Sequence, residues 1–143
     1  MKKDIYSKEN LESLVYSLIK YLYRTKDYYG ERLSKDVMIY SMDKIYYIDE
    51  RKIPNLYLGK VPVCVEENFK IEDYFEYYNN KTLALSMESR LSEYLYNYDV
   101  PDCEEVSDRI SKIFEKHGFY YEFGANWYLY AEPKNNDDRN QKK

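Results

Sequence analysis

The sequence predicts an α+β fold. We expect one domain, in which an antiparallel sheet of about four to six strands packs against an N-terminal helix and a second helix near residues 103–117. Apolar residues recur at helical spacing in these two segments, whereas the stretches between and after them alternate as half-buried strands do. With 143 residues, the chain is long enough for one domain with a sizeable core. We assign residues 1–133 to this domain and expect the polar tail 134–143 to be disordered.

Residues 7–25 form the clearest predicted helix. Ser7 is a suitable N-cap residue, and Gly30 follows as a stop signal. One apolar stripe runs along the segment at three-and-four spacing and consists of Leu11, Leu14, Val15, Leu18, Ile19 and Leu22. We expect this stripe to face the core.

The next part of the chain predicts strands. Two runs rich in β-forming residues, 37–41 and 44–48, flank a Met-Asp pair and predict a hairpin. The stretch 52–67 adds one or two short strands. Pro54 and Pro62 favour a position for these strands at a sheet edge or a bulge, because proline cannot donate to a strand ladder.

The middle of the chain holds two further predicted elements. Residues 71–78 favour a short helix. Farther on, Leu83, Leu85 and Met87 alternate with smaller or polar side chains, which is typical of a half-buried strand, and the residues after them suit a helix. We prefer a strand followed by a helix over residues 81–97, and one continuous helix is the alternative.

The helix over residues 103–117 leads into a C-terminal β-hairpin. Asp102 is the predicted N-cap, and Gly118 is expected to take the left-handed position after the last turn. His117 lies at the helix end, where an imidazolium complements the helix dipole. The apolar face of the helix consists of Val106, Ile110, Ile113 and Phe114.

The hairpin of residues 119–133 is dense in aromatic side chains. A three-residue loop, Gly124-Ala125-Asn126, sorts them best, because a one-residue change of register reverses every side chain. The core face would then carry Phe119, Tyr121, Phe123, Trp127, Leu129 and Ala131. The other face would carry Tyr120, Glu122, Tyr128, Tyr130 and Glu132. The hairpin contains no Lys or Arg, whereas base-stacking platforms lie in positively charged grooves, so it is poorly suited to nucleic acid.

Charge is distributed unevenly along the chain. Residues 1–60 carry 12 basic and 9 acidic side chains, whereas residues 61–133 carry 6 basic and 15 acidic ones. A negative field of this size repels phosphate backbones and attracts basic surfaces, so we expect no direct binding of nucleic acid. No apolar run approaches the length of a membrane span, and no signal peptide is recognisable. We therefore expect a cytoplasmic protein without membrane contact.

The sequence favours a protein without catalytic activity, bound metal or cofactor. It has one histidine, two cysteines without a CxxC pattern, and four separated glycines that cannot form a phosphate-binding loop. Carboxylates followed by a lysine do occur in the pattern of a magnesium-dependent nuclease, as Asp102, Glu132 and Lys134. A metal-dependent nuclease is therefore the less favoured alternative.

Residues 76–98, EYYNNKTLALSMESRLSEYLYNY, resemble a segment of small uncharacterised proteins from phages and conjugative elements of low-GC Gram-positive bacteria. The matching positions are Asn79 or Asn80, Thr82, Leu83, Ser86, Glu88 and Leu91. Met87 replaces a phenylalanine of that pattern, and Ser89 replaces a glycine. The resemblance implies a mobile-element context and no assigned chemistry. Small, acidic, tyrosine-rich proteins in that context include anti-CRISPR proteins, which block the nucleic-acid groove of an effector nuclease.

We therefore expect a non-catalytic, anti-CRISPR-like inhibitor that mimics nucleic acid and binds a basic, nucleic-acid-handling host protein such as a CRISPR effector nuclease. Tyrosine suits such an interface, because its ring supplies contact area at low entropy cost. The candidate partner-binding residues form two groups: Glu66, Glu67, Glu72, Asp73, Glu76, Tyr77 and Tyr78, and then Tyr120, Glu122, Tyr128 and Tyr130. The alternative is a homo-oligomeric structural or regulatory module, such as a homodimer, whose exposed tyrosines form the self-interface.

Overall fold

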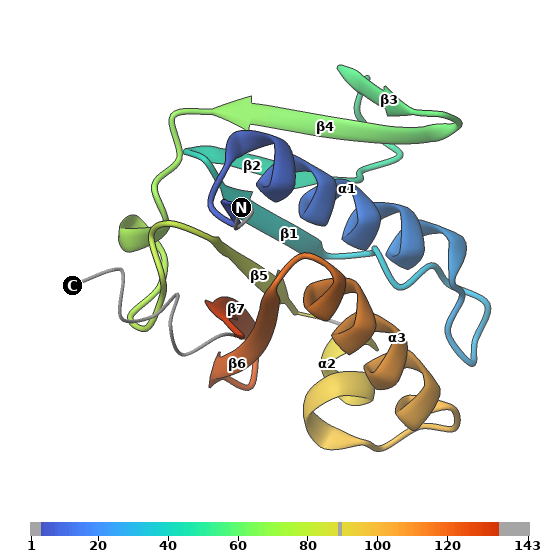
Figure 1. Ribbon diagram of the computed structural model, residues 1–143. Coiled ribbons are helices and arrows are strands. Elements are labelled where there is room, and N and C mark those ends of the chain that lie inside the picture. The colour runs from blue at the N-terminus through green and yellow to red at the C-terminus, as the bar shows by residue number, and fades with distance from the viewer. Residues whose placement is uncertain (1–3, 89, 135–143) are drawn as a thin grey trace.

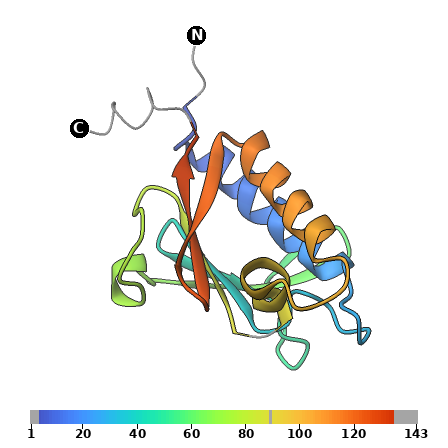
Figure 2. The same cartoon turned by 90° about the horizontal axis from the view of Figure 1, so that it is seen from below.

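The computed structural model describes residues 4–88 and 90–134, so nearly all of the predicted tail lies outside the described residues. The described strands are β1 (Val37–Ser41), β2 (Lys44–Tyr47), β3 (Leu56–Leu58), β4 (Val61–Glu67), β5 (Leu83–Met87), β6 (Phe119–Ala125) and β7 (Tyr128–Pro133). They form one seven-stranded antiparallel sheet in the order β3-β4-β2-β1-β5-β7-β6. Helices α1 (Lys8–Arg24) and α3 (Cys103–Lys116) cover one face of this sheet (Figures 1 and 2). The predicted α+β fold is confirmed, with slightly more strands than expected.

Helix α1 begins directly after Ser7, whose hydroxyl accepts a hydrogen bond from the Asn10 amide at 3.1 Å. The predicted apolar stripe of α1 is buried. Together with Val106, Ile110 and Phe114 of α3, it forms the larger core on what we call the helix face of the sheet. Neither α1 nor any other helix in the described part of the chain is long and apolar enough to cross a membrane.

The first four strands lie where the sequence predicts them. Met42 and Asp43 both have positive φ angles, 55° and 61°, as the tight turn of a two-residue hairpin requires. Strand β3 forms one edge of the sheet, and Pro62 lies in the half of β4 that pairs with β3 alone. The predicted edge position of this stretch is therefore confirmed.

Strand β5 decides between the two alternatives for residues 81–97. It is followed by a helical turn, α2 (Arg90–Ser92), and a π-helical turn, η2 (Glu93–Asn97), so the preferred order of strand and helix is confirmed. The alternation predicted a half-buried strand, but all five residues of β5 are buried. The reason is that β5 lies inside the sheet and both faces of the sheet are covered.

The two ends of α3 differ in how they are capped. Asp102 occupies the predicted N-cap position, but its side chain makes no capping hydrogen bond. Its backbone is left-handed, with φ of 66°, whereas a capping side chain needs an extended backbone to reach the first turn. The predicted capping role of the Asp102 side chain is therefore wrong. At the other end Gly118 has the expected positive φ, 93°, and its amide donates to the Glu115 carbonyl at 3.0 Å.

The C-terminal hairpin turns differently from the prediction. Phe123 pairs with Leu129 rather than with Trp127, and Asn126 and Trp127 form a two-residue turn after a bulge at Gly124. The predicted three-residue loop is therefore wrong. The sorting of the side chains is nevertheless kept, because the register differs from the predicted one by two residues and an even shift leaves each side chain on its face. Two residues leave the predicted core set: Trp127 lies in the turn, and Phe123, next to the bulge at Gly124, is 38% exposed.

The opposite face of the sheet, here called the loop face, has a smaller core of its own. This core consists of Tyr40, Ile45, Tyr47, Cys64, Ile71, Phe75, Ala84 and Tyr128. The segment of residues 68–80 connects β4 to β5 and covers part of this face. The helix predicted over residues 71–78 is wrong, because only a 3-10 turn, η1 (Ile71–Asp73), forms there.

Candidate functional site

The segment of residues 68–80 contains most of the first group of predicted partner-binding residues. It is held on the loop face by Phe75, which is buried among aromatic rings. The centroid of the Phe75 ring lies 4.9 Å from that of Tyr40, 4.7 Å from that of Tyr128 and 5.6 Å from that of Trp127, with which it stacks. This one anchor leaves the charged neighbours of Phe75 on the surface.

Tyr128 belongs to the same anchor and is only 2% exposed. Its hydroxyl accepts a hydrogen bond from the Tyr77 amide at 3.0 Å, and its ring lies so close to Gly124 that a Cβ there would overlap it. The predicted exposure of Tyr128 on the outer face of the hairpin is therefore wrong. Its role is to position Tyr77, which is 56% exposed.

Asn79 fixes the far end of the segment to β7. Its buried side-chain amide donates to Glu132 Oε1 at 2.9 Å, and its Oδ1 accepts from the Lys81 amide at 2.9 Å. The Thr82 hydroxyl donates to the Ala131 carbonyl at 2.7 Å. These contacts hold the segment beside the hairpin, although Asn79 and Glu132 are 53 positions apart in the sequence.

An open hollow of about 630 Å³ lies where the segment meets the hairpin. It is lined by Glu76, Tyr77, Tyr78, Asn79, Asn80, Tyr130 and Glu132. Tyr77 and Tyr78 come from the first predicted group and Tyr130 from the second, so the fold brings the two groups together. We define the acidic tyrosine surface as the acidic and tyrosine residues that line this hollow, together with the exposed carboxylates that precede them in the segment and the two β6 residues hydrogen-bonded beside Tyr130. It consists of Glu72, Asp73, Glu76, Tyr77, Tyr78, Tyr120, Glu122, Tyr130 and Glu132.

One carboxylate orders the hairpin side of the acidic tyrosine surface. Glu122 accepts hydrogen bonds from the Tyr120 hydroxyl at 2.8 Å and from the Tyr130 hydroxyl at 3.0 Å. Burial, the hydrogen bond to Glu122 and the negative charges of Glu122 and Glu132 raise the pKa of Tyr130 to about 12. Tyr130 is therefore protonated at physiological pH and acts as a hydrogen-bond donor to Glu122.

Four carboxylates of this surface lack basic partners in the part of the chain that the structure describes. Among the described residues, Glu72, Asp73, Glu76 and Glu122 take part in no ion pair. Their negative field therefore extends into the solvent, where it attracts cationic groups.

Two predicted residues lie away from this surface. Glu66 and Glu67 are exposed at the end of β4, but neighbouring residues of a strand point to opposite faces of the sheet. Strand β4 is four strand spacings from β7, which is about 19 Å. Glu66 accepts a hydrogen bond from the Tyr47 hydroxyl, and Glu67 lies 3.8 Å from the Lys44 ammonium.

The sequence reasoning did not assign Asn79 and Asn80 to the site. Asn79 reaches Glu132 only because β5 pairs with β7, and that pairing joins distant parts of the sequence. A local signal was present nonetheless. Two asparagines directly before a predicted strand are typical of a turn held by a side chain, and Asn79 forms such a turn with the Lys81 amide.

The nuclease-like set of residues does not come together. Glu132 lies near the C-terminal end of α3, where the Lys134 amide donates to the Gly118 carbonyl at 3.0 Å. Asp102 lies at the opposite end of this 14-residue helix, about 21 Å away along its axis. Among the residues that the structure describes, no group of three His, Cys, Asp or Glu side chains is arranged to hold a metal ion.

His117 joins the two helices. Its Nδ1 lies 2.7 Å from the Ile113 carbonyl oxygen, and its Nε2 lies 2.9 Å from the Ser13 hydroxyl oxygen. Because a carbonyl oxygen can only accept, Nδ1 carries a proton in this arrangement. The predicted position of His117 at the helix end is confirmed, and its contacts tie the end of α3 to α1.

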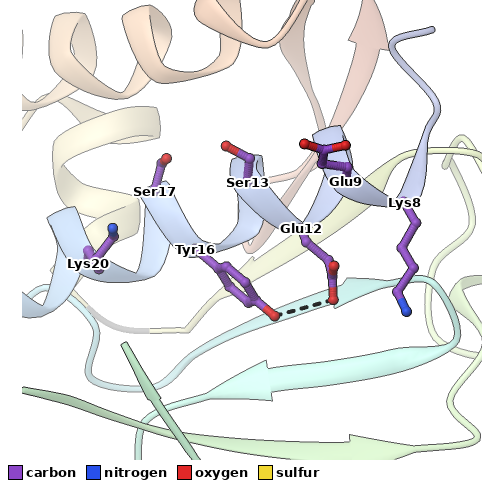
Figure 3. A pocket seen from close by; sticks show the side chains of 7 residues that line it. All are labelled: Lys8, Glu9, Glu12, Ser13, Tyr16, Ser17 and Lys20. Carbon is purple, nitrogen blue, oxygen red and sulfur yellow. Dashed lines mark hydrogen bonds between the residues drawn. The ribbon is translucent and has the colours of Figure 1, made fainter. Parts of the chain in front are cut away.

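A second hollow follows the outer side of α1 (Figure 3). It is lined by Lys8, Glu9, Glu12, Ser13, Tyr16, Ser17 and Lys20. The Tyr16 hydroxyl donates to Glu12 at 3.3 Å, and the acidic and basic side chains are equal in number. Figure 3 shows the side chains spread along the helix rather than converging on one point. The charges of these side chains therefore cancel, and the side chains do not converge on a common point where a ligand could bind.

A third hollow, of about 730 Å³, contains several basic side chains, among them Arg32, Lys35 and Arg51. Each of these three is paired with a carboxylate within the protein. The pairs are Arg32 with Glu50 at 3.8 Å, Lys35 with Glu31 at 3.1 Å, and Arg51 with Asp49 at 3.1 Å. These positive charges are compensated internally, in contrast to Glu72, Asp73, Glu76 and Glu122, which have no ion-pair partner among the described residues.

No family model, no curated protein and no solved structure matches this chain. The fold and the site together define its class as an α+β domain that carries acidic and tyrosine side chains on the sheet face opposite its helices.

Proposed function

We propose that the protein is a non-catalytic inhibitor, encoded by a phage or another mobile element, that binds a basic, nucleic-acid-handling host protein through the acidic tyrosine surface. Its carboxylates take the place of phosphates, so that the protein acts as a nucleic-acid mimic of the anti-CRISPR kind. A CRISPR effector nuclease is the candidate partner.

One observation carries this proposal. Four carboxylates, Glu72, Asp73, Glu76 and Glu122, are exposed on the segment of residues 68–80 and on the hairpin beside it, without an ion-pair partner among the described residues. Groups that are already paired must lose their partners before they bind a new one, whereas these carboxylates meet a basic groove without that cost. Such complementarity accelerates encounter and favours basic partners over acidic ones.

The tyrosines support the same interpretation. Tyr77 and Tyr78 project beside the carboxylates and are 56% and 39% exposed. Proteins that bind nucleic acid present arginine side chains, and a guanidinium group both pairs with a carboxylate and stacks on an aromatic face. A surface that offers the two contacts side by side therefore suits an arginine-rich groove.

Charge reversal at the acidic tyrosine surface tests the proposal. The test variant combines Glu72→Lys with Glu76→Lys. The control combines Glu104→Lys with Glu115→Lys, which changes the net charge equally at exposed positions of α3. The assay measures how well each protein displaces fluorescent target DNA from a panel of guide-loaded CRISPR effector nucleases.

We expect the wild type and the control to displace DNA from an effector, and the test variant to be at least about tenfold weaker. Displacement should weaken as salt rises, because salt screens exposed charges. Equal potency of the test variant and the wild type would contradict the proposed surface. If no effector of the panel is inhibited, the candidate partner is wrong.

A further inference from the structure

Strand β6 forms the free edge of the sheet at the end opposite to β3 (Figure 1). Exposed edge strands invite pairing with another chain, and proteins usually protect them by shortness, by proline or by basic side chains. Strand β3 has such protection, because it is only three residues long. Strand β6 has seven residues and contains no Pro, Lys or Arg.

The hydrogen-bond pattern shows which backbone groups of β6 face this free edge. Gly118 and Lys134 lie opposite each other, one position beyond the Phe119–Pro133 pair. The Lys134 amide donates to the Gly118 carbonyl at 3.0 Å, so Gly118 and Lys134 form a hydrogen-bonded pair of the β6–β7 ladder. Bonded and non-bonded pairs alternate in an antiparallel ladder. The backbone groups of Phe119, Tyr121 and Phe123 therefore point away from β7. Outside the ladder, no described residue forms a hydrogen bond with them.

The opposite strand agrees with this pattern. Pro133 pairs with Phe119 and has no amide hydrogen to donate. At a hydrogen-bonded position it would remove one ladder hydrogen bond, whereas at a non-bonded position it removes none.

Aromatic side chains are exposed at the same edge. Phe123, which the sequence places in the core, is 38% exposed, and Tyr96 of η2 is 47% exposed. Their rings contact edge to face, with centroids 5.1 Å apart. The free backbone groups of β6 are thus accompanied by apolar surface that pairing would remove from water.

We propose that β6 pairs antiparallel with β6 of a second copy, about a two-fold axis at Tyr121. The bulge at Gly124 limits the regular edge to residues 119–123, and Tyr121 is the midpoint of that stretch. In this register Phe119 lies opposite Phe123 of the second copy, and Tyr120 lies opposite Glu122. A register centred on Glu122 would instead oppose two carboxylates, which is unfavourable.

Such pairing extends the sheet across both copies and places the two acidic tyrosine surfaces on the same face. Each chain has a net charge of −4, so the two copies repel one another and salt should strengthen their association. Binding of a basic partner through the acidic tyrosine surface should instead weaken with salt. The dimer is thereby distinguishable from the proposed function and does not depend on it.

Sedimentation equilibrium over a wide range of concentration and salt tests the association. Hydrogen exchange read at single amides locates it. As concentration rises, we expect protection to increase at Phe119, Tyr121 and Phe123. The amides of Tyr120 and Glu122 already face β7, so their protection should change little.

Phe123→Lys places a charge on the free edge and should raise the dimer dissociation constant at least about tenfold. Tyr57→Lys, at an exposed position of β3, is the matched control and should leave the constant unchanged. A monomer at every concentration, or a dimer that is insensitive to Phe123→Lys, would overturn the proposal. Protection of the edge amides only in the presence of another protein would also overturn it, because a partner strand would then complete the sheet.

Discussion

The hydroxyl of Tyr130 lies between an apolar sheet face and two carboxylates, and this position controls its ionisation. Its ring packs against the smaller core on the loop face, which disfavours a charged phenolate. Burial is the largest cause of its raised pKa, followed by the hydrogen bond to Glu122. Burial also raises the pKa of Tyr40 and Tyr46, which lie within the sheet.

This ionisation predicts a specific loss of stability in alkali. The pKa of Tyr130 is about 12 in the folded protein, against about 10 in an unfolded chain. The raised pKa therefore stabilises the fold below about pH 10, and this contribution is lost as the pH rises toward about 12. We predict that Tyr130→Phe makes the fall in unfolding free energy over this range less steep. Urea denaturation at a series of pH values measures the slope.

The control for this experiment is Tyr57→Phe on the exposed edge strand β3, which should leave the slope as in the wild type. A Tyr130→Phe variant with the wild-type slope would show that Tyr130 does not titrate as described.

Tyr128 and Tyr130 show that the alternation of side chains along a strand predicts the face on which a residue lies but not whether it is buried. Both point to the loop face, as the sequence predicts. Tyr128 is nevertheless buried, because the segment of residues 68–80 lies over its ring, whereas Tyr130 borders the open hollow. Alternation assigns a side chain to a face, but it contains no information on what covers that face.

Among the elements, the β6–β7 hairpin depends on one glycine. Gly124 lies beneath the ring of Tyr128, and this ring is packed against Phe75 and Trp127. Replacing glycine by alanine within a strand is ordinarily favourable, because alanine loses less chain entropy on folding. At Gly124 the close approach of the Tyr128 ring should instead make the substitution by alanine destabilising.

We predict that Gly124→Ala lowers the unfolding free energy by about 1–3 kcal/mol, as overpacking of a well-packed site does. Urea denaturation measures the change. The same substitution in a Tyr128→Leu background is the control, since the ring is then absent and most of the cost should disappear. An equal cost in both backgrounds would mean that the ring is not the cause.

The segment of residues 68–80 explains why a helix prediction failed. Ile71 and Phe75 have helical spacing, and both are buried. The Tyr77 amide, which a helix would direct to the Asp73 carbonyl, donates instead to the Tyr128 hydroxyl at 3.0 Å. Contacts with the sheet thus replace the hydrogen bonds that a helix would form within itself.

At the scale of the whole molecule, one sheet carries a core on each face. Strands β1 and β5 contribute to both cores: Ile39 and Leu85 lie in the larger one, Tyr40 and Ala84 in the smaller one. Neither core can lose its packing without exposing a strand that the other core needs. The two cores should therefore unfold as one cooperative unit.

Two spectroscopic signals test this cooperativity. Trp127, the only tryptophan, stacks on Phe75 at the loop face, whereas α1 and α3 lie on the helix face. We predict that urea unfolding has the same midpoint by tryptophan fluorescence and by far-UV circular dichroism. An earlier midpoint in fluorescence would contradict the prediction and would show that the segment of residues 68–80 detaches first.

The candidate site was predictable in part. Acidic residues concentrate in residues 61–133, and the exposed positions of Glu76, Tyr77 and Tyr78 agree with the predicted surface. The sequence could not show that Glu66 and Glu67 lie on other parts of the sheet. Position along the chain does not reveal strand order, and strand order sets the distance between β4 and β7.

The sequence by itself determined most elements of this protein, the segment of residues 68–80 excepted, and the sorting of strand side chains to faces, because helical and alternating periodicity are local properties that neighbouring residues enforce. It also determined the excess of carboxylates in one half of the chain. Only the tertiary structure decided that Tyr77 and Tyr130 share one hollow, that Tyr128 is buried, and that β6 has a free edge. These features depend on the pairing of β5 with β7 and on the segment that crosses the loop face. Such contacts join distant residues, so no local pattern encodes them.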